Sequence, residues 1–184
     1  YGMNSYASQS MDFLPTHTSR RKHKYMANFY NDNPDLQFYI DREIDWEPLL
    51  ELTELGKADT PYESWQDARD NYKEILAMLG EFSAEEIAPY WEELDTQESK
   101  VVNGEVVEAP RMAQIFERIR ELELHGLCLP RELGGMNCPL LLHSVTAELL
   151  ARSDAAIMTH YSFHGGMALA MLIYSLHEGS TEVD

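Results

Sequence analysis

Cysteine is scarce in this chain, and its placement fits neither of the common structural uses of cysteine. Among 184 residues there are only Cys128 and Cys138, ten positions apart. A single pair at that spacing is neither a zinc-binding pattern nor a disulfide framework. We therefore expect both thiols to stay reduced, which favours a reducing compartment and a cytoplasmic location.

Positive charge is also scarce. The chain has 14 Lys and Arg against 32 Asp and Glu, a formal net charge of -18 and a sequence pI of about 4.6. Such a molecule repels phosphate backbones and anionic lipid surfaces, so we expect no nucleic-acid partner. The acidic residues are interpreted as a solubilising surface, and the short basic cluster at residues 20–24 as part of a solvated arm.

Several functional patterns are missing as well. The sequence has no Gly-x-Ser-x-Gly motif, no glycine-rich phosphate loop followed by Lys, and no secretory apolar run in its first 25 residues. The apolar stretch at residues 155–176 is long enough to span a membrane, but His160, Ser162 and His164 interrupt it. We therefore predict no transmembrane segment, and interpret this stretch as a core helix buried on several faces.

What the sequence does contain is helical periodicity. The hydrophobic fraction of 44% is sufficient for a core, and apolar residues recur every three or four positions over much of the chain. We predict an all-α fold, a helical bundle of about five or six helices with one short β-hairpin. Residues 1–25, which lack a sustained period, are expected to form an irregular N-terminal arm.

In the first half of the chain, one segment has an ambiguous pattern. Leu36, Phe38 and Ile40 alternate with polar residues, which indicates a short strand or an extended connector. Asp45 is a plausible N-cap for the next helix, and the chain then carries an apolar face that ends at Gly56. Its members are leucines at positions 49, 50, 52 and 55.

The next helices have clearer boundaries. Ser64 is the expected N-cap of a helix over residues 65–82 that carries one buried stripe. A further segment starts at Ser83, and Pro89 predicts a bend near Ala88 because proline supplies no backbone N–H.

A hairpin and another helix follow. Asn103-Gly104 between valine pairs predicts a type I′ turn, since both residues tolerate positive φ. Pro110 is expected to open a helix that runs to His125-Gly126.

A proline and glycine turn then precedes two apolar helices. The run from Gly126 to Leu129 is expected to be extended, with Gly134-Gly135 reversing the chain and Pro139 opening a helix. Ser153 or Asp154 should cap the last helix.

The segment Gly-Leu-Cys-Leu-Pro-Arg-Glu-Leu-Gly-Gly at 126–135, followed by Glu-Leu-Leu-Ala-Arg-Ser-Asp-Ala at 148–155, resembles the N-terminal helical domain of the acyl-CoA dehydrogenase family. The opening at 27–36 is similar to the head of the longer members, the group that contains methylmercaptopropionyl-CoA dehydrogenases. The resemblance implies that residues 26–184 form this one domain.

For the whole enzyme, the resemblance implies a flavin-dependent α,β-dehydrogenation of an acyl-CoA substrate. It implies FAD as cofactor, electron-transfer flavoprotein as electron acceptor, and a homo-oligomer. In the family the catalytic base and most of the flavin site lie in later domains, which are absent from this chain. We therefore expect no catalytic residue here. The alternative is a non-catalytic helical interaction module.

The same resemblance implies that the last helix contributes to the acyl pocket. The substrate-binding candidates are residues that helical turns could place on one cavity: Met158, Thr159, Ser162, Phe163, Gly166 and Met167. The Gly165-Gly166 pair indicates a close approach by either a packed neighbour or a ligand, and we leave both open.

Two other sets of residues could in principle take part in chemistry, and we interpret both as structural. His160 and His164 have a spacing that can hold a metal, but no Glu-x-x-His pattern accompanies them, so we expect buried or substrate-lining histidines and no metal site. Glu148 is interpreted as the partner of Arg152 at i+4 rather than as a general base.

Overall fold

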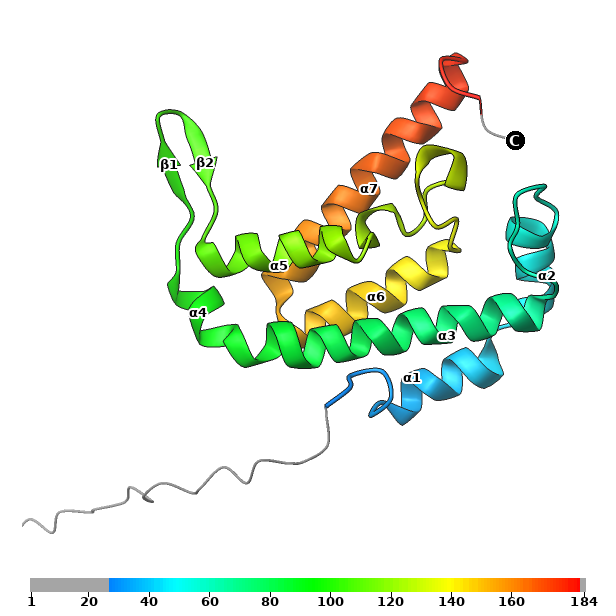
Figure 1. Ribbon diagram of the computed structural model, residues 1–184, viewed down its shortest axis with the longest axis horizontal. Helices are drawn as coiled ribbons and strands as arrows, with labels where there is room; N and C mark the ends of the chain where they lie inside the picture. The colour runs from blue at the N-terminus through cyan, green and yellow to red at the C-terminus, as the bar shows by residue number, and fades with distance from the viewer. Residues whose placement is uncertain (1–26, 183–184) are drawn as a thin grey trace, which may run out of the picture.

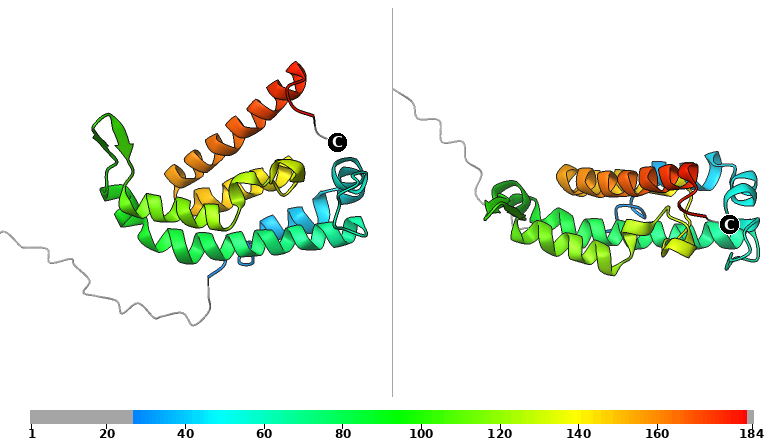
Figure 2. Two further views of the ribbon diagram at one scale, coloured as in Figure 1. Left: turned by 45° about the horizontal axis from the view of Figure 1, so that its top comes forward. Right: turned by 90° about the horizontal axis from the view of Figure 1, so that it is seen from above.

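The computed structural model describes residues 27–182, and it has the predicted fold class (Figure 1). The longest helix of the first half, α3 (Trp65–Phe82), runs across the lower part of the molecule in this view. Helix α6 (Leu140–Ser153) lies against it, and α5 (Pro110–Glu121) is drawn above it. Helix α7 (Ala155–Glu178) forms an outer layer and diverges from the body toward its C-terminal end (Figure 2).

The segment expected to be a strand is helical, so that prediction was wrong. Helix α1 (Pro34–Phe38) continues into a π-helical turn at Tyr39–Glu43. The Asn33 side chain accepts a hydrogen bond from the Leu36 backbone N–H at 3.1 Å, an N-cap that the sequence reading missed. Leu36 and Ile40, four residues apart, are buried, whereas Phe38 between them is exposed. The period is therefore that of a helix.

Helix α2 (Trp46–Leu50) and the π-helical turn Glu51–Leu55 start and end where predicted, but a different face is buried. Leu50 is buried together with Trp46, while Leu52 is 84% exposed. Asp45 precedes the helix without making a side-chain cap bond. Trp46 is fixed instead by its indole N–H, which donates to the Ile40 carbonyl at 2.7 Å.

The boundaries of α3 are as predicted. The Ser64 hydroxyl accepts a hydrogen bond from the Asp67 N–H, and a stripe containing Tyr72 and Leu76 is fully buried. The bend near Ala88 is confirmed: a π-helical turn (Ser83–Ile87) and a 3-10 turn (Ala88–Tyr90) separate α3 from α4 (Trp91–Thr96). Pro89 lies at this break.

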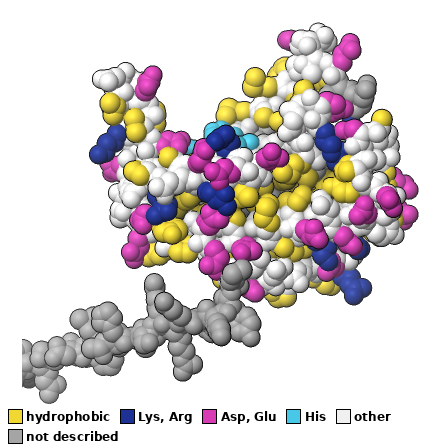
Figure 3. Space-filling view, viewed as in Figure 1, with side chains coloured by type: hydrophobic (Ala, Val, Ile, Leu, Met, Phe, Trp, Pro, Cys, Tyr) yellow, Lys and Arg dark blue, Asp and Glu magenta, His cyan; other side chains and the backbone are white. Residues whose placement is uncertain are grey.

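The predicted hairpin is also confirmed. Strands β1 (Lys100–Val102) and β2 (Glu105–Val107) are antiparallel, and the turn residues Asn103 and Gly104 have φ of 54° and 86°. The hairpin projects from the body (Figure 1). The space-filling view shows hydrophobic side chains on the hairpin and across the body, among many acidic side chains (Figure 3).

Helix α5 is shorter than predicted. It ends at Glu121, and Glu123 then takes a left-handed conformation with φ of 57° before a 3-10 turn at Leu124–Gly126. The hydrogen bond from the Glu123 N–H to the Arg120 carbonyl closes the end of α5, so the chain leaves the helix before the predicted glycine stop.

Helix α7 is the largest departure from expectation. Only Ile157 and Tyr161 are buried in it, so a helix buried on several faces is not what this chain forms. The exposed large side chains are Phe163, Met167, Met171, Ile173, Tyr174 and Leu176. Within residues 27–182, no helix combines the length and the apolar character needed to cross a membrane.

Candidate functional site

The turn between residues 126 and 139 is a closed loop rather than an extended piece. Hydrogen bonds join the two ends of this loop. The backbone N–H groups of Met136, Asn137 and Cys138 donate to the carbonyls of residues 126, 129 and 127, at 2.8–3.0 Å. Gly134 supplies the predicted positive φ of 81°. A Cβ on Gly135 would lie 2.1 Å from the Leu129 carbonyl oxygen, so only glycine allows this approach.

The junction of α6 and α7 is set by Asp154. Its backbone is extended, with φ of -162°, and its carboxylate accepts a hydrogen bond from the Ile157 N–H at 2.9 Å. Of the two predicted caps, Asp154 is therefore the N-cap, while the Ser153 hydroxyl donates to the Leu150 carbonyl at 2.7 Å. This cap fixes the direction in which α7 leaves α6.

The first two turns of α7 are anchored by an aromatic pair. The Tyr161 hydroxyl donates to the Leu124 carbonyl at 3.3 Å, and the His143 ring stacks on the Tyr161 ring with centroids 5.2 Å apart. Burial lowers the pKa of the His143 imidazole and raises that of the Tyr161 phenol. Both side chains are therefore neutral near pH 7.

The six predicted pocket residues lie on the outer part of α7. Four are exposed and two, Met158 and Ser162, are partly buried. Thr159 donates its hydroxyl hydrogen to the Ala155 carbonyl at 2.8 Å, and Ser162 donates to the Met158 sulfur at 3.6 Å. Because both hydroxyls bond within the helix, the face that these residues present is largely apolar. Within residues 27–182, these six side chains do not enclose a cavity of their own.

The two glycines of α7 have different environments. A Cβ on Gly165 would lie 2.8 Å from the His143 Cε1, whereas a Cβ on Gly166 meets nothing within 4 Å. Gly165 thus accommodates the packed His143 ring, and Gly166 opens to free space. Both border a small pocket of about 40 Å³. The other lining residues are His125, Leu127, Cys128, Leu129, Leu140, His143 and Leu169.

The histidines at 160 and 164 are exposed rather than buried, and both contact an aromatic residue. Their ring centroids lie 5.6 and 5.9 Å from that of Phe116 on α5, and His125 lies 5.9 Å from His164. Burial, with smaller contributions from His164 and Arg120, lowers the pKa of His125. Within residues 27–182, no group of three or more His, Cys, Asp or Glu side chains is arranged to hold a metal ion.

The predicted pair of Glu148 and Arg152 does not form. Arg152 instead lies over the Phe29 ring, 4.3 Å from its centroid, and donates to the Phe29 carbonyl at 3.3 Å. No ion pair involves Glu148 in the described part of the chain. The segment that contains Phe29 packs against the end of α6. Arg152 therefore contacts this segment and not Glu148, the partner predicted from helical spacing.

Both cysteines are free thiols, as predicted, and both lie in the turn. Burial raises the pKa of Cys128 to about 11 and that of Cys138 to about 12. The thiolate is the nucleophilic form, so neither group is activated for covalent chemistry near pH 7.

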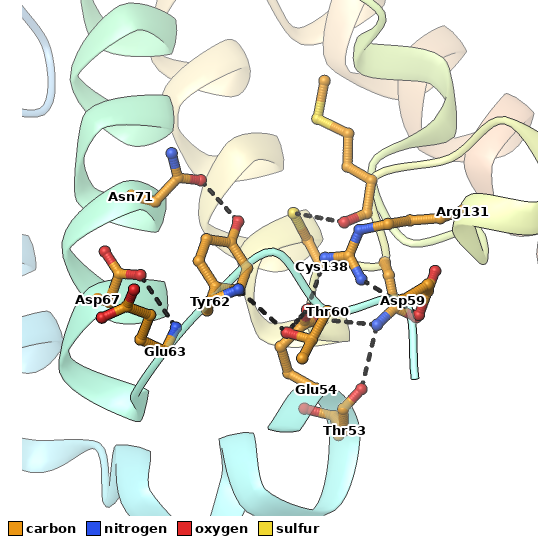
Figure 4. A network of polar contacts seen from close by, with 12 residues as sticks. Thr53, Glu54, Asp59, Thr60, Tyr62, Glu63, Asp67, Asn71, Arg131 and Cys138 are labelled. Carbon is orange, nitrogen blue, oxygen red and sulfur yellow. Dashed lines mark hydrogen bonds and ion pairs between the residues drawn. The ribbon is translucent and has the colours of Figure 1, made fainter. Parts of the chain in front are cut away.

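A buried polar network, which the sequence reading missed, joins the turn to the segment after α2 (Figure 4). The Glu54 side chain is completely buried. Its carboxylate accepts hydrogen bonds from Arg131 at 2.6 Å, from Asn137 at 2.7 Å and from Thr60 at 2.9 Å. An acid within a leucine-rich segment was the available signal, but two of its three partners are 77 and 83 residues away.

Comparisons with known proteins place this arrangement in a family. The family described as "Acyl-CoA dehydrogenase, N-terminal domain" matches residues 69–182. The chain is 26% identical over 104 residues to a 2-methylacyl-CoA dehydrogenase, mitochondrial, of Solanum tuberosum, and 24% identical over 104 residues to an isovaleryl-CoA dehydrogenase, mitochondrial, of Arabidopsis thaliana. Each alignment covers 56% of this chain and 23% of the relative. The matched region contains the turn, α6 and α7, and the chain belongs to the acyl-CoA dehydrogenase N-terminal domain family.

Proposed function

We propose that this chain is the N-terminal part of a flavin-dependent acyl-CoA dehydrogenase, in which α7 forms one wall of the acyl pocket. The enzyme would oxidise an acyl-CoA thioester between its α and β carbons. The observation that carries the proposal is the exposed, largely apolar face of α7 in a chain that belongs to this family. That face carries the six predicted residues, Met158, Thr159, Ser162, Phe163, Gly166 and Met167.

The exposure of α7 supports a larger protein around it. Phe163 is 65% exposed, Met171 73% and Tyr174 69%, and apolar surface of this extent is stabilised when another surface covers it. The chain spans about a quarter of the length of the relatives that it matches. We infer that the remaining domains cover one side of α7, that the enzyme is a homo-oligomer, and that electron-transfer flavoprotein accepts its electrons.

Helix α7 does not offer a site for the flavin cofactor by itself. FAD carries a pyrophosphate, which requires hydrogen-bond donors or positive charge. Helix α7 has no Lys or Arg, and the hydroxyls of Thr159 and Ser162 are bonded within the helix. Its face suits an acyl chain better than a dinucleotide. We therefore assign FAD binding mainly to domains outside this chain and assign no catalytic step to these residues.

Three finer assignments belong to the same proposal. We take residues 26–184 as one domain preceded by the arm at 1–25, which lies outside the described residues. We place the protein in the long-form group because of the similarity at residues 27–36. The cytoplasmic location also stays a prediction, and the relatives named above are mitochondrial by name.

Replacing Gly166 by Leu in the complete enzyme tests the pocket. Since a Cβ at this position meets nothing within 4 Å, the new side chain starts in open space, and it would fill space that an acyl group would use. Turnover of long or bulky acyl-CoA substrates should fall much more than turnover of short ones, with flavin content and melting temperature retained.

Met171→Leu, on an exposed position further along α7, is the matched control and should leave the acyl-chain preference unchanged. An equal loss for every chain length would remove Gly166 from the pocket, and loss of the flavin would assign it to domain packing.

The exposed face of α7 is also what a non-catalytic interaction module would use to bind a partner. Absorption in the flavin bands, together with a larger polypeptide in the purified protein, supports the enzyme. A colourless protein of 21.2 kDa that binds no flavin supports the module.

A further inference from the structure

The buried carboxylate of Glu54 joins two parts of the chain that differ in their relation to the family. Glu54 and Thr60 precede the family-matched region, which begins at residue 69, whereas Arg131 and Asn137 belong to the turn inside that region. Figure 4 shows the side chains of Glu54 and Thr60, from the segment after α2, meeting that of Arg131 from the turn. The network is thus a link between the preceding segment and the turn.

The link contains an ion pair in which each charge compensates the other. Glu54 is 0% exposed and Arg131 is 21% exposed, and their N···O distance is 2.6 Å. The second terminal nitrogen of Arg131 is buried without a hydrogen-bond partner in the described part of the chain, and the Asp59 carboxylate lies 3.8 Å away. Removing the Glu54 charge would therefore leave a poorly compensated guanidinium in the interior.

The link holds the turn at two points. Arg131 lies near its middle, and Asn137, in a left-handed conformation with φ of 55°, lies near its end. The Asn137 side-chain amide donates both to Glu54 and to the Thr53 carbonyl, at 2.7 and 3.1 Å. The same turn carries Leu127, Cys128 and Leu129, which line the small pocket beside Gly165 and Gly166.

We propose that Glu54 is a positioning residue, which clamps the turn at residues 126–139 to the segment after α2 and so sets the shape of the pocket that the turn forms with the two glycines of α7. Without this clamp, the turn would open locally while the helices remain folded. An effect of Glu54 on an acyl group rests on the proposed function, whereas opening of the turn is measurable without any activity.

The chain provides its own reporters of this opening, because its two cysteines both lie in the turn. In the protein that carries this chain, labelling by a maleimide can be followed at Cys128 and Cys138 separately by peptide mapping. With Glu54→Gln, we expect labelling of Cys138 to accelerate by about tenfold or more in the absence of denaturant. A local opening exposes little surface, so this rate should be nearly independent of low urea concentrations.

Lys73→Gln is the matched control. It breaks the Lys73–Asp41 ion pair, which also joins the preceding segment to α3 at 2.7 Å but is 35% and 41% exposed. Its labelling rates should stay within about twofold of the parent protein, since exposed pairs contribute little. The double variant Glu54→Gln with Arg131→Met should label more slowly than Glu54→Gln alone, because the guanidinium that has lost its buried partner is also removed.

The clamp is disproved if Glu54→Gln leaves both rates unchanged, or if its acceleration shows the steep urea dependence of global unfolding. An equal acceleration in Lys73→Gln would also disprove it. If Glu54→Gln does not fold, Thr60→Val, which removes a single donor to the carboxylate, takes its place. A smaller, urea-independent acceleration at Cys138 then supports the clamp, and an unchanged rate overturns it.

Discussion

Helices α6 and α7 are neighbours in sequence and similar in composition, yet the structure uses them in different ways. Five residues of α6 are buried, including Leu142, Leu149 and Leu150, and the helix packs between α3 and α7. Helix α7 is ten residues longer and buries only Ile157 and Tyr161. An apolar helical sequence therefore indicates that the helix needs a covering surface, but it does not indicate whether the same chain supplies that surface.

The difference follows from geometry. Helix α6 lies in the middle of the body, so opposite sides of it meet protein. Helix α7 is anchored near its start by Asp154 and Tyr161 and then leaves the body, and its later turns carry the exposed side chains of Met171, Ile173 and Tyr174. The following substitutions test whether side chains of the two helices contribute differently to the free energy of unfolding, as their burial suggests.

The largest expected effect is at the buried helix. Leu149→Ala should lower the free energy of unfolding by about 3 kcal/mol, because it leaves a cavity at a residue that is 1% exposed. Met171→Ala on α7, at a residue 73% exposed, should change it by less than about 0.5 kcal/mol. Urea unfolding of this chain measures both values. Equal losses would mean that α7 is covered in solution.

The two glycines of α7 should respond with opposite signs. Gly165→Ala places a Cβ 2.8 Å from a His143 ring that is stacked on Tyr161, so we expect a net loss of about 1–2 kcal/mol. Gly166→Ala meets no neighbour and gains helix propensity, which should stabilise by up to about 1 kcal/mol. Urea unfolding measures both changes. A lower free energy of unfolding for both variants would show that Gly166 is packed.

The junction between the helices should contribute less. Asp154→Ala removes the side-chain acceptor for the Ile157 N–H and should cost about 1 kcal/mol. Asp154→Asn keeps an acceptor and should cost only a few tenths of that loss. Melting temperatures of the two variants provide the measurement. Equal melting temperatures for them would indicate that the cap does not hold α7.

The smallest effect is a pH dependence at the contact of α6 with α7. Burial lowers the pKa of His143 below 6.5 in the folded state, so the unfolded state binds more protons. Its contribution therefore favours the folded state at neutral pH and weakens as pH falls below about 6.5. His143→Phe keeps the ring on Tyr161 without this titration.

The fall in melting temperature from pH 7.5 to pH 5.5 should accordingly be smaller for His143→Phe than for the parent protein. His177→Phe, at an exposed position near the end of α7, is the control and should leave the difference as it is in the parent protein. Identical pH profiles for all three proteins would mean that His143 does not couple its protonation to folding.

Much of the candidate site was accessible to sequence reading, but not its contacts. A helix cap at Ser153 or Asp154, the positive φ at Gly134 and the free cysteines follow from residue type and local spacing. The division of roles between Gly165 and Gly166 does not, because it depends on where His143 of another helix lies. The Glu54 network was missed for the same reason, since two of its three partners are distant in sequence.

What the sequence determined by itself is local: where α3, the bend at Pro89 and the hairpin begin and end, and the family to which the turn belongs. Each of these rests on short-range steric and hydrogen-bonding preferences. The tertiary structure alone decided which apolar residues are covered. Burial of Leu50 rather than Leu52, and exposure of Met171 rather than Leu149, depend on the position of neighbouring elements, which composition and periodicity do not encode.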